Sequence, residues 1–389
     1  MTSRRSVALL LETSNAYARG LLDGIIDYLR EHEQWSIHLG EQERGAKPPH
    51  WLKNWRGDGI IARIETEAIA NAVRQTGLPI VDVSAARLVP SLPWVETDDR
   101  EIARMALEHF LSRGFHSVAF CGENYFNWSR WRAEAFEEFA NEAECQFESF
   151  DSGSRRRLNM GNTRQRTRLA KWILSLPRPT GIFACYDFMG QQILDVCREL
   201  EISVPEQIAV LGVDNDQRLC RLCSPPLSSI IPDTRATGYA AAQLLDELMT
   251  SSRTRKSQPA QILIPPQGIA ERQSSDMYAS DDVDLVAALR FIREHACEGI
   301  TVNDVLRQVP LSRRALEARC QKLTGRTPHA EITRIKLERS KRLLRQTGLT
   351  VHEVAQRSGF SQAEYLSVVF KKQTGQTPGE FRSSGLAGS

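Results

Sequence analysis

Residues 359–382 read GFSQAEYLSVVFKKQTGQTPGEFR, and this stretch decides how the C-terminal part of the chain is organised. Gly359 follows a short helical pattern over residues 351–357 and can supply the positive φ of a tight turn. Ser361 is a favourable N-cap for a second helix, which is predicted to run to residue 373. The buried stripe of that helix is predicted at Tyr365, Leu366, Val369 and Phe370. A short helix, a turn and a capped amphipathic helix together predict a helix–turn–helix motif.

The same pattern occurs once more upstream. Residues 301–307 form a short helical pattern, residues 308–311 form a turn, and Ser312 can cap a helix over residues 313–324. Leu316 and Cys320 are four residues apart and are predicted to point inward. A long helical pattern over residues 328–344 joins the two motifs. One such motif is weak evidence, because many corners between helices look alike, but two in series indicate a DNA-binding domain much more strongly.

Charge is segregated along the chain. Residues 305–389 contain 16 Lys and Arg against 6 Asp and Glu, a net charge of +10, whereas the remaining residues carry −8. The whole-chain charge of +2 hides this division. Because neutralisation of phosphates dominates affinity for nucleic acid, the basic segment is suited to double-stranded DNA.

A recognition helix needs one face anchored in a core and the other free to enter the major groove. We therefore predict the DNA contacts on the outward faces and N-terminal ends of the two second helices. In the first motif the predicted residues are Ser312, Arg313, Arg314, Glu317 and Gln321. In the second motif they are Ser361, Gln362, Glu364, Ser367 and Lys371.

These two motifs resemble the signature of the AraC/XylS-type transcription activators. The similarity is carried by residues 359–361, Tyr365, residues 369–372, Gly375, residues 377–378 and residues 381–382, and upstream by residues 336–339. The departures are Cys320 and Leu366, where the family usually has Phe, Pro310 in place of a turn Gly, and Leu306 in place of Ala. The resemblance implies an all-α DNA-binding domain of seven helices.

The first 275 or so residues follow a different pattern, in which β-like runs alternate with amphipathic helical stretches. The β-like runs lie at residues 7–11, 35–39, 59–62, 79–83, 117–121, 181–184 and 208–213. The helical stretches lie at residues 17–30, 67–75, 100–112, 131–142, 164–174 and 191–200. Such alternation predicts parallel sheets covered by crossover helices, here enough for two lobes. Ligands of such sheets bind beyond the carboxyl ends of the strands.

This pattern resembles the effector domain of the LacI/GalR-type repressors, a two-lobed periplasmic-binding-protein-like fold. The similarity is carried by residues 57–61, 97–99, 132–136, Asp187 and residues 208–215. In place of that family's N-terminal DNA-binding segment, the chain has an AraC-type domain after the sensor. This combination is similar to the family of xylose-operon regulators of enteric and related bacteria.

The expected architecture is an α/β two-lobed periplasmic-binding-protein-like sensor plus an all-α double helix-turn-helix domain. We predict the sensor at residues 1–275, a linker at 276–283 and the DNA-binding domain at 284–389. The resemblance implies a sugar-responsive transcription activator, with D-xylose as the expected sugar and a different sugar as the alternative. It also implies a homodimer that binds a double-stranded DNA operator and contacts RNA polymerase.

The sugar site is predicted from polar and aromatic residues near strand ends. A pentose offers hydroxyls that both donate and accept, which suits carboxylates, arginine and aromatic faces. The predicted ligand-binding residues are Glu12, Thr13, Tyr17, Asp98, Trp131, Arg132, Asp187 and Asp214. The resemblance places Asp98, Arg132 and Asp214 at ligand-contacting positions. The alternative for Asp98 and Asp187 is helix capping, and for Asp214 it is a turn after a strand.

Other function classes are less well supported. An enzyme acting on a sugar stays open as an alternative, but the sequence has no GxGxxG after the first strand, no GxxxxGK[ST], no GxSxG and no HExxH motif. Cys220 and Cys223 lack a second pair of zinc ligands, so neither a metal nor a cofactor is expected. The N-terminal apolar run is too short for a signal peptide and no stretch could span a membrane, so a cytoplasmic protein is expected. Arg155, Arg156 and Arg157 are predicted to lie in a solvated loop.

Overall fold

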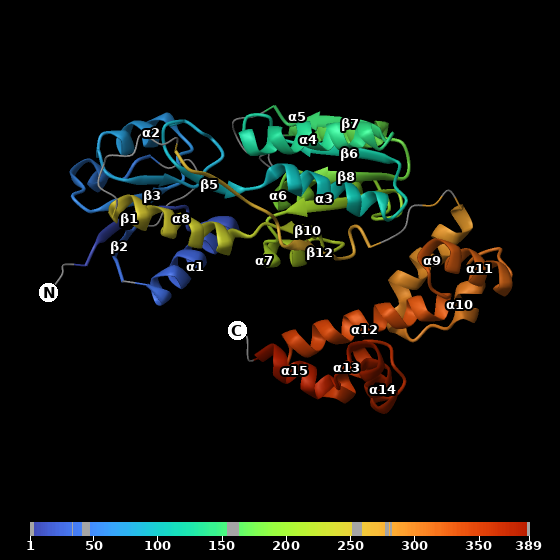
Figure 1. The fold of residues 1–389 in the computed structure, drawn as a ribbon. Coiled ribbons are helices and arrows are strands. Elements are labelled where there is room, and N and C mark those ends of the chain that lie inside the picture. Colours follow the sequence, from blue (N-terminus) through green and yellow to red (C-terminus); the bar gives the residue numbers. More distant parts are fainter. Residues whose placement is uncertain are drawn as a thin grey trace. The chain divides into compact units, whose positions relative to one another are not determined.

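The structure of the chain is a computed structural model that describes residues 4–32, 34–40, 47–153, 163–250, 259–276, 280 and 282–386. It contains two compact units, Met1–Met277 and Tyr278–Ser389 (Figure 1). The three arginines at positions 155–157 lie outside the described residues.

The first unit contains two sheets, each at the centre of one lobe. Lobe 1 has the strand order β11-β5-β4-β3-β1-β2, and all its strand pairs are parallel. Its strands are β1 (Ser6–Leu10), β2 (Ser36–Leu39), β3 (Gly59–Ala62), β4 (Ile80–Asp82), β5 (Trp94–Thr97) and β11 (Gln261–Ile264). Its helices are α1 (Ala16–Glu31), the short 3₁₀ helix η1 (His50–Asn54), α2 (Glu67–Arg74) and α8 (Thr234–Thr250).

Lobe 2 has the strand order β12-β10-β9-β8-β6-β7, with only the β10–β12 pair antiparallel among its described strands. Its strands are β6 (Ser117–Gly122), β7 (Gln146–Asp151), β8 (Thr180–Ala184), β9 (Ile208–Val213), β10 (Ser228–Ile231) and β12 (Gly268–Ala270). Its helices are α3 (Asp99–Leu111), α4 (Asn127–Glu142), α5 (Thr163–Ser175), α6 (Asp187–Glu199) and α7 (Gln217–Leu222). The chain passes between the lobes after β5, after β10 and after β11, so α8 and β11 return to lobe 1.

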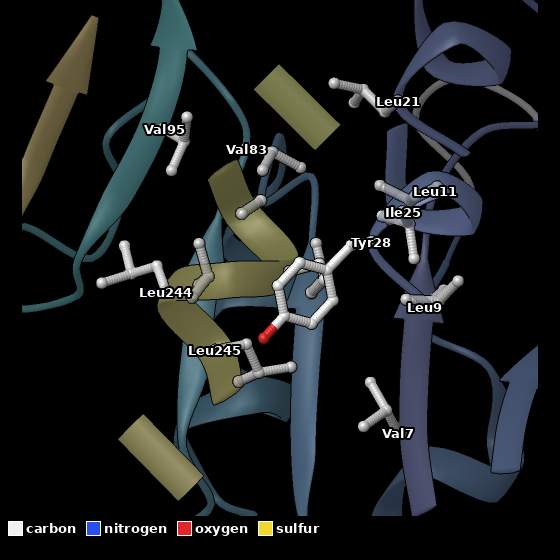
Figure 2. Packing of buried hydrophobic residues seen from close by; sticks show 14 of the residues in the cluster. Val7, Leu9, Leu11, Leu21, Ile25, Tyr28, Val83, Val95, Leu244 and Leu245 are labelled. Carbon is white, nitrogen blue, oxygen red and sulfur yellow. The ribbon is translucent and has the colours of Figure 1, made fainter. Parts of the chain in front are cut away.

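α1 and α8 lie side by side in lobe 1 (Figure 1). A Cβ on Gly24 would overlap the carbonyl oxygen of Arg235, and one on Gly238 would overlap that of Leu21. The missing side chains therefore let the two helix backbones approach closely. Figure 2 shows the core that these helices form with the sheet, made by Val7, Leu9, Leu11, Leu21, Ile25, Tyr28, Val83, Val95, Leu244 and Leu245. Burial of each large apolar side chain contributes about 1.5–3 kcal/mol to this core.

The second unit consists of helices in its described part. They are α9 (Val283–His295), the 3₁₀ helix η2 (Ala296–Glu298), α10 (Val302–Leu306), α11 (Arg313–Thr324), α12 (Pro328–Gln346), α13 (Val351–Arg357), α14 (Ala363–Thr374) and α15 (Pro378–Leu386). One core surrounds Leu316 and Cys320 of α11, and the other surrounds Leu366 and Phe370 of α14. α12 supplies Ile332 to the first core and residues of its second half to the second, so it joins the two motifs.

The predicted fold class is confirmed, and so is the expected seven-helix count within the described residues. Every predicted β-like run overlaps a strand. Ser312 caps α11 by accepting a hydrogen bond from the Ala315 amide over 3.2 Å, and Gly359 has a φ of 76°. Two predictions for the second motif were wrong, namely its N-cap residue and the burial of Tyr365. Gln362, without a side-chain cap bond, is the N-cap of α14 in place of Ser361, and Tyr365 is 47% exposed because the core is filled by its neighbours.

No helix in the described part of the chain is long and apolar enough to cross a membrane. All eight cysteines are free thiols, and seven of them are buried.

Candidate functional site

A cavity of about 180 Å³ lies between the two lobes of the first unit, where the carboxyl ends of both sets of strands meet. Parallel sheets place their ligands at this edge, because the connecting loops are free to vary there. Lobe 1 lines the cavity with Ser14, Asn15, Ala16, Tyr17, Arg63, Ala85, Glu96 and Thr97. Lobe 2 lines it with Trp128, Arg132, Tyr186, Asp187, Phe188, Asp214, Asp216 and Leu219.

The turn between β1 and α1 forms one wall. Asn15 is the N-cap of α1, and its Oδ1 accepts a hydrogen bond from the Ala18 amide over 2.7 Å. Its Nδ2 donates to Glu12 Oε2, also over 2.7 Å. Tyr17 sits in the first turn of α1, with its hydroxyl 2.9 Å from the Thr97 hydroxyl at the end of β5. These bonds fix the cavity side of the turn with respect to the sheet.

Arg63 and Glu96 bring buried charge to the lobe 1 wall. Arg63 directly follows β3, forms an ion pair with Glu65, and has its guanidinium 5.1 Å from the centre of the Tyr17 ring. Its Nε is buried without a hydrogen-bond partner among the described residues, and it lies 3.9 Å from Glu12 Oε2 in a second ion pair. Glu96 of β5 is 5% exposed, and burial together with the Asp99 carboxylate raises the pKa of Glu96 to about 8. Glu96 therefore lines the cavity as a carboxyl group that can both donate and accept hydrogen bonds near neutral pH.

Arg132 of α4 is the central cation of the lobe 2 wall. Its Nε donates to Asp99 Oδ1 over 2.7 Å, and its Nη1 donates to the carbonyl oxygen of Cys185 over 2.6 Å. The guanidinium carbon lies 5.1 Å from the centre of the Trp128 ring, close enough for a cation–π interaction. Arg132 is only 5% exposed, so its remaining donors are held in a fixed direction. The pKa of Asp99 is raised by burial, although Arg132 opposes that shift.

Asp187 begins α6 and ties several elements together. Its Oδ1 accepts from the Ser229 hydroxyl over 2.6 Å, and its Oδ2 accepts from the Asp216 amide over 2.7 Å and from the Cys220 thiol over 3.3 Å. Three hydrogen bonds already occupy the Asp187 carboxyl group, so about one position on it remains for a ligand. Burial and the nearby Asp214 carboxylate raise the pKa of Asp187 to about 8.

Asp214 follows β9 in a strained backbone conformation. The backbone φ angle is 102° at Asp214 and 48° at Asn215. Residues other than glycine rarely adopt such positive values. The Asp214 amide donates to the Ile230 carbonyl over 3.2 Å, and the carboxylate is close enough to influence the pKa of both Arg132 and Asp187. Backbone strain of this kind clusters at ligand sites, where the surroundings hold it.

Aromatic rings complete the lobe 2 wall. Trp128 and Tyr186 meet edge to face with ring centres 5.7 Å apart, and the Tyr186 hydroxyl donates to Glu123 over 3.1 Å. Phe188 is 42% exposed at the same wall. The site thus combines fixed donors, carboxyl groups and apolar ring faces, which suits a small molecule with several hydroxyls. Among the described residues no cluster of His, Cys, Asp or Glu could hold a metal ion.

The structure brings four of the eight predicted ligand residues to the cavity, namely Tyr17, Arg132, Asp187 and Asp214. The other four lie outside its lining. Asp98 caps α3 by accepting from the Glu101 amide over 3.0 Å. Glu12 accepts a hydrogen bond from the Asn15 side chain, and the Thr13 carbonyl accepts one from Arg19. The Trp131 ring centre lies 5.8 Å from the Arg87 guanidinium.

Arg63, Glu96, Thr97 and Asp216 line the cavity but were not predicted from the sequence. Arg63 directly follows a strand that was predicted to the residue, so its position was a usable signal. Glu96 and Thr97 belong to β5, a strand of four residues that the pattern did not reveal.

The candidate DNA interface lies on α11 and α14 of the second unit. Arg313, Arg314, Glu317 and Gln321 are exposed on α11, as are Gln362, Glu364 and Lys371 at α14. Several of the predicted side chains are already engaged within the unit. Arg313 and Glu317 form an ion pair over 3.6 Å on α11. Gln321 donates to the Gly325 carbonyl over 2.8 Å, and Ser367 donates to the Ala363 carbonyl over 2.9 Å. Each helix therefore buries one face in a core and leaves charged and polar groups on the other.

Comparison with protein families divides the chain in the same order. Residues 6–100 match the family described as "XylR N-terminal domain", residues 107–275 match "Periplasmic binding protein-like domain", and residues 305–384 match "Helix-turn-helix domain". The predicted kinds of domain are thus recovered from independent matches.

Relatives match over nearly the whole chain. The Xylose operon regulatory protein of Escherichia coli (strain K12) is 34% identical over 390 residues, covering 98% of this chain and 97% of the relative. That of Haemophilus influenzae is 31% identical over 384 residues, covering 97% of both. A solved structure described as "xylose-binding transcription activator xylR" is 32% identical, covers 98% of this chain and 99% of its own, and superposes with a TM-score of 0.78.

Proposed function

The chain belongs to the family of the xylose operon regulatory proteins, and on that premise we propose that it is a transcription activator gated by D-xylose. The proposed sensor comprises residues 1–275, the linker residues 276–283, and the DNA-binding domain residues 284–389. The protein would act in the cytoplasm on genes of pentose utilisation. The enzyme alternative is not favoured, because the full-length relatives are transcription regulators.

The observation that carries the sugar-binding role is the convergence of buried polar groups on one small cavity. Glu96 and Asp214 supply carboxyl oxygens, Arg63 and Arg132 supply donors, and Trp128 offers an aromatic face. Charge-assisted hydrogen bonds to hydroxyls are stronger than neutral ones, and an aromatic face packs well against the C–H side of a sugar. Tyr17 and Asp187 complete the proposed set, whereas ligand roles for Glu12, Thr13, Asp98 and Trp131 remain predictions.

The two lobes suggest how a sugar acts as a switch. Connections after β5, β10 and β11 can serve as hinges between the lobes, and a ligand that contacts both walls favours the conformation in which they are close. A coupling free energy of about 1–3 kcal/mol between two ligands is typical of allosteric proteins and would suffice here for sugar and DNA. We propose that a homodimer places its pairs of helix–turn–helix motifs on repeated operator half-sites and contacts RNA polymerase there.

The first test is calorimetric titration of the full-length protein with D-xylose, D-ribose, L-arabinose and D-glucose. We expect D-xylose to bind most tightly. D214N should weaken that binding strongly, since Asn tolerates the positive φ but removes the charge. The matched control is E134Q, which changes an exposed side chain on α4. The affinity of this variant for D-xylose should equal that of the wild type. Preference for another sugar would reassign the ligand, and no binding of any sugar would contradict the proposal.

The second test measures DNA binding. A fragment selected from a random pool by the sugar-loaded protein serves as the operator, and fluorescence anisotropy gives its affinity with and without D-xylose. We expect the affinity or the footprint to change on addition of the sugar. If neither changes, sugar gating is wrong even if the sugar binds.

A further inference from the structure

Residues 271–276 form the last described segment of the first unit before the chain continues toward α9, and we name them the exit segment. Ser274 fixes it to the sheet of lobe 2. The Val210 amide donates to the Ser274 carbonyl over 2.8 Å, the Ser274 hydroxyl donates to the Val210 carbonyl over 2.6 Å, and the Ser228 amide donates to the Ser274 hydroxyl over 2.8 Å. Ser274 is fully buried. The exit segment therefore follows any movement of β9 and β10.

Arg272 links the exit segment to the cavity. Its Nη2 donates to Asn215 Oδ1 over 2.6 Å, and its Nη1 donates to the Leu227 carbonyl over 2.8 Å. Its backbone amide and carbonyl both bond to the Ser228 hydroxyl, each over 2.8 Å. Its Nη1 also donates to the Ala270 carbonyl over 3.3 Å. Of these partners in lobe 2, only Asn215 belongs to the loop at the cavity.

Asn215 stands between Asp214 and Asp216, both of which line the cavity. On the cavity side, the Asp216 amide donates to Asp187 over 2.7 Å. On the other side, the Asn215 side chain accepts the bond from Arg272. Residues 214–216 are therefore held between the Asp187 carboxyl group, which lines the cavity, and the exit segment. Asp214 and Asn215 both have positive φ, so small changes in what they contact shift the balance between backbone conformations.

We propose that the Arg272–Asn215 hydrogen bond is the relay through which occupancy of the cavity alters the exit segment and, along the chain, the affinity of the second unit for DNA. This inference rests on the proposed sugar-gated function. It makes Arg272 and Asn215 positioning residues, which carry the signal without touching the sugar. A ligand that binds Asp214 or competes for Asp187 resets residues 214–216, and the bond transmits the change in one step.

The test uses N215G, N215D and R113A in the full-length protein. N215G removes the amide acceptor while glycine tolerates the φ of 48°. N215D keeps an oxygen acceptor at the same place. R113A is the matched control, since the Arg113–Glu271 ion pair, 2.7 Å long, also holds the exit segment but does not reach residues 214–216. Arg272 itself is left intact, because its backbone-directed bonds hold the fold.

The readout is the ratio of DNA affinities with and without D-xylose, measured by anisotropy on the selected fragment. Such ratios are typically about 5–150 in allosteric proteins. We expect N215G to bring the ratio close to 1 while the thermal melt and the D-xylose affinity of the DNA-free protein change little. N215D and R113A should keep the wild-type ratio. The D-xylose affinity measured with and without DNA must change by the same factor, since coupling is reciprocal.

Three results would overturn the relay. N215G could keep the wild-type ratio, which would place the coupling elsewhere. R113A could lose the ratio as fully as N215G, which would mean that general loosening of the exit segment is responsible. The wild type itself could show no response to D-xylose, in which case the proposed function fails together with the relay. A wild-type response with an unchanged N215G response removes the relay alone.

Discussion

Replacing Glu96 with glutamine should stabilise the sensor, and by more as the pH rises. The pKa of Glu96 is about 8 against an ordinary value of 4.5, because the carboxyl group is buried beside Asp99. Between these two values the folded protein keeps a proton that the unfolded chain releases. The stability of the wild type therefore falls as the pH rises from 4.5 to 8. Glutamine carries no such proton.

The size of the effect follows from the shift. At about 1.36 kcal/mol per unit of pKa, the loss for the wild type is about 1 kcal/mol at pH 5 and about 3 kcal/mol at pH 7. Asp187 titrates in both proteins, so its contribution cancels in the difference between them. The melting temperature of E96Q relative to the wild type should thus gain roughly 4–8 °C between pH 5 and pH 7, at about 2–4 °C per kcal/mol.

The assay is thermal unfolding followed by circular dichroism at pH 5, 6, 7 and 8, without sugar. Any packing change caused by the amide adds the same offset at every pH, so the slope with pH carries the result. E108Q, at an exposed position of α3, is the control and should give a flat difference. A flat difference for E96Q as well would refute the reasoning and mean that the Glu96 carboxylate is stabilised in the folded protein by groups the cavity wall does not show.

Three further predictions concern other parts of the chain. G24A should lower the free energy of unfolding of the sensor by about 1–3 kcal/mol, because the new methyl group overlaps the Arg235 carbonyl, whereas G40A, in open space, should leave the melting temperature unchanged. S312A should destabilise the second unit by about 1 kcal/mol through the lost cap of α11, measured by urea unfolding. K371A should reduce the slope of log affinity for DNA against log salt by about 0.9, and an unchanged slope would exclude a phosphate contact.

The strongly periodic elements could be predicted from sequence because their burial is one-sided or complete. β3 and β9 are buried at every residue, and the predicted runs match them to the residue. α8 was not predicted because Gly238, which lets it approach α1 closely, and several alanines blur its apolar stripe. β11 and β12 escaped because they lie at sheet edges with mostly half-exposed residues, where hydrophobicity does not alternate clearly.

The candidate site was half predictable for a related reason. Asp187 and Asp214 follow strands with clear apolar runs, so their position at the carboxyl edge could be inferred. Glu96 lies within β5, where a buried carboxyl group interrupts the apolar pattern and hides the strand itself. Glu96 thus makes the cavity wall polar and is also the reason why β5 was not predicted from the sequence. Its partners in space, Arg63 and Asp99, come from other elements, and only the fold shows that they meet.

The return of α8 and β11 to lobe 1 has a consequence for synthesis of the protein. The core under α1 needs Leu244 and Leu245, and β5 has no outer neighbour until residues 261–264 pair with it. Most of lobe 2 emerges from the ribosome before these residues do, although lobe 1 starts first. The first strands therefore wait with part of their apolar surface uncovered while more than a hundred residues are added. We expect the nascent chain to be most prone to aggregation during this interval, and the DNA-binding unit is made only after it has passed.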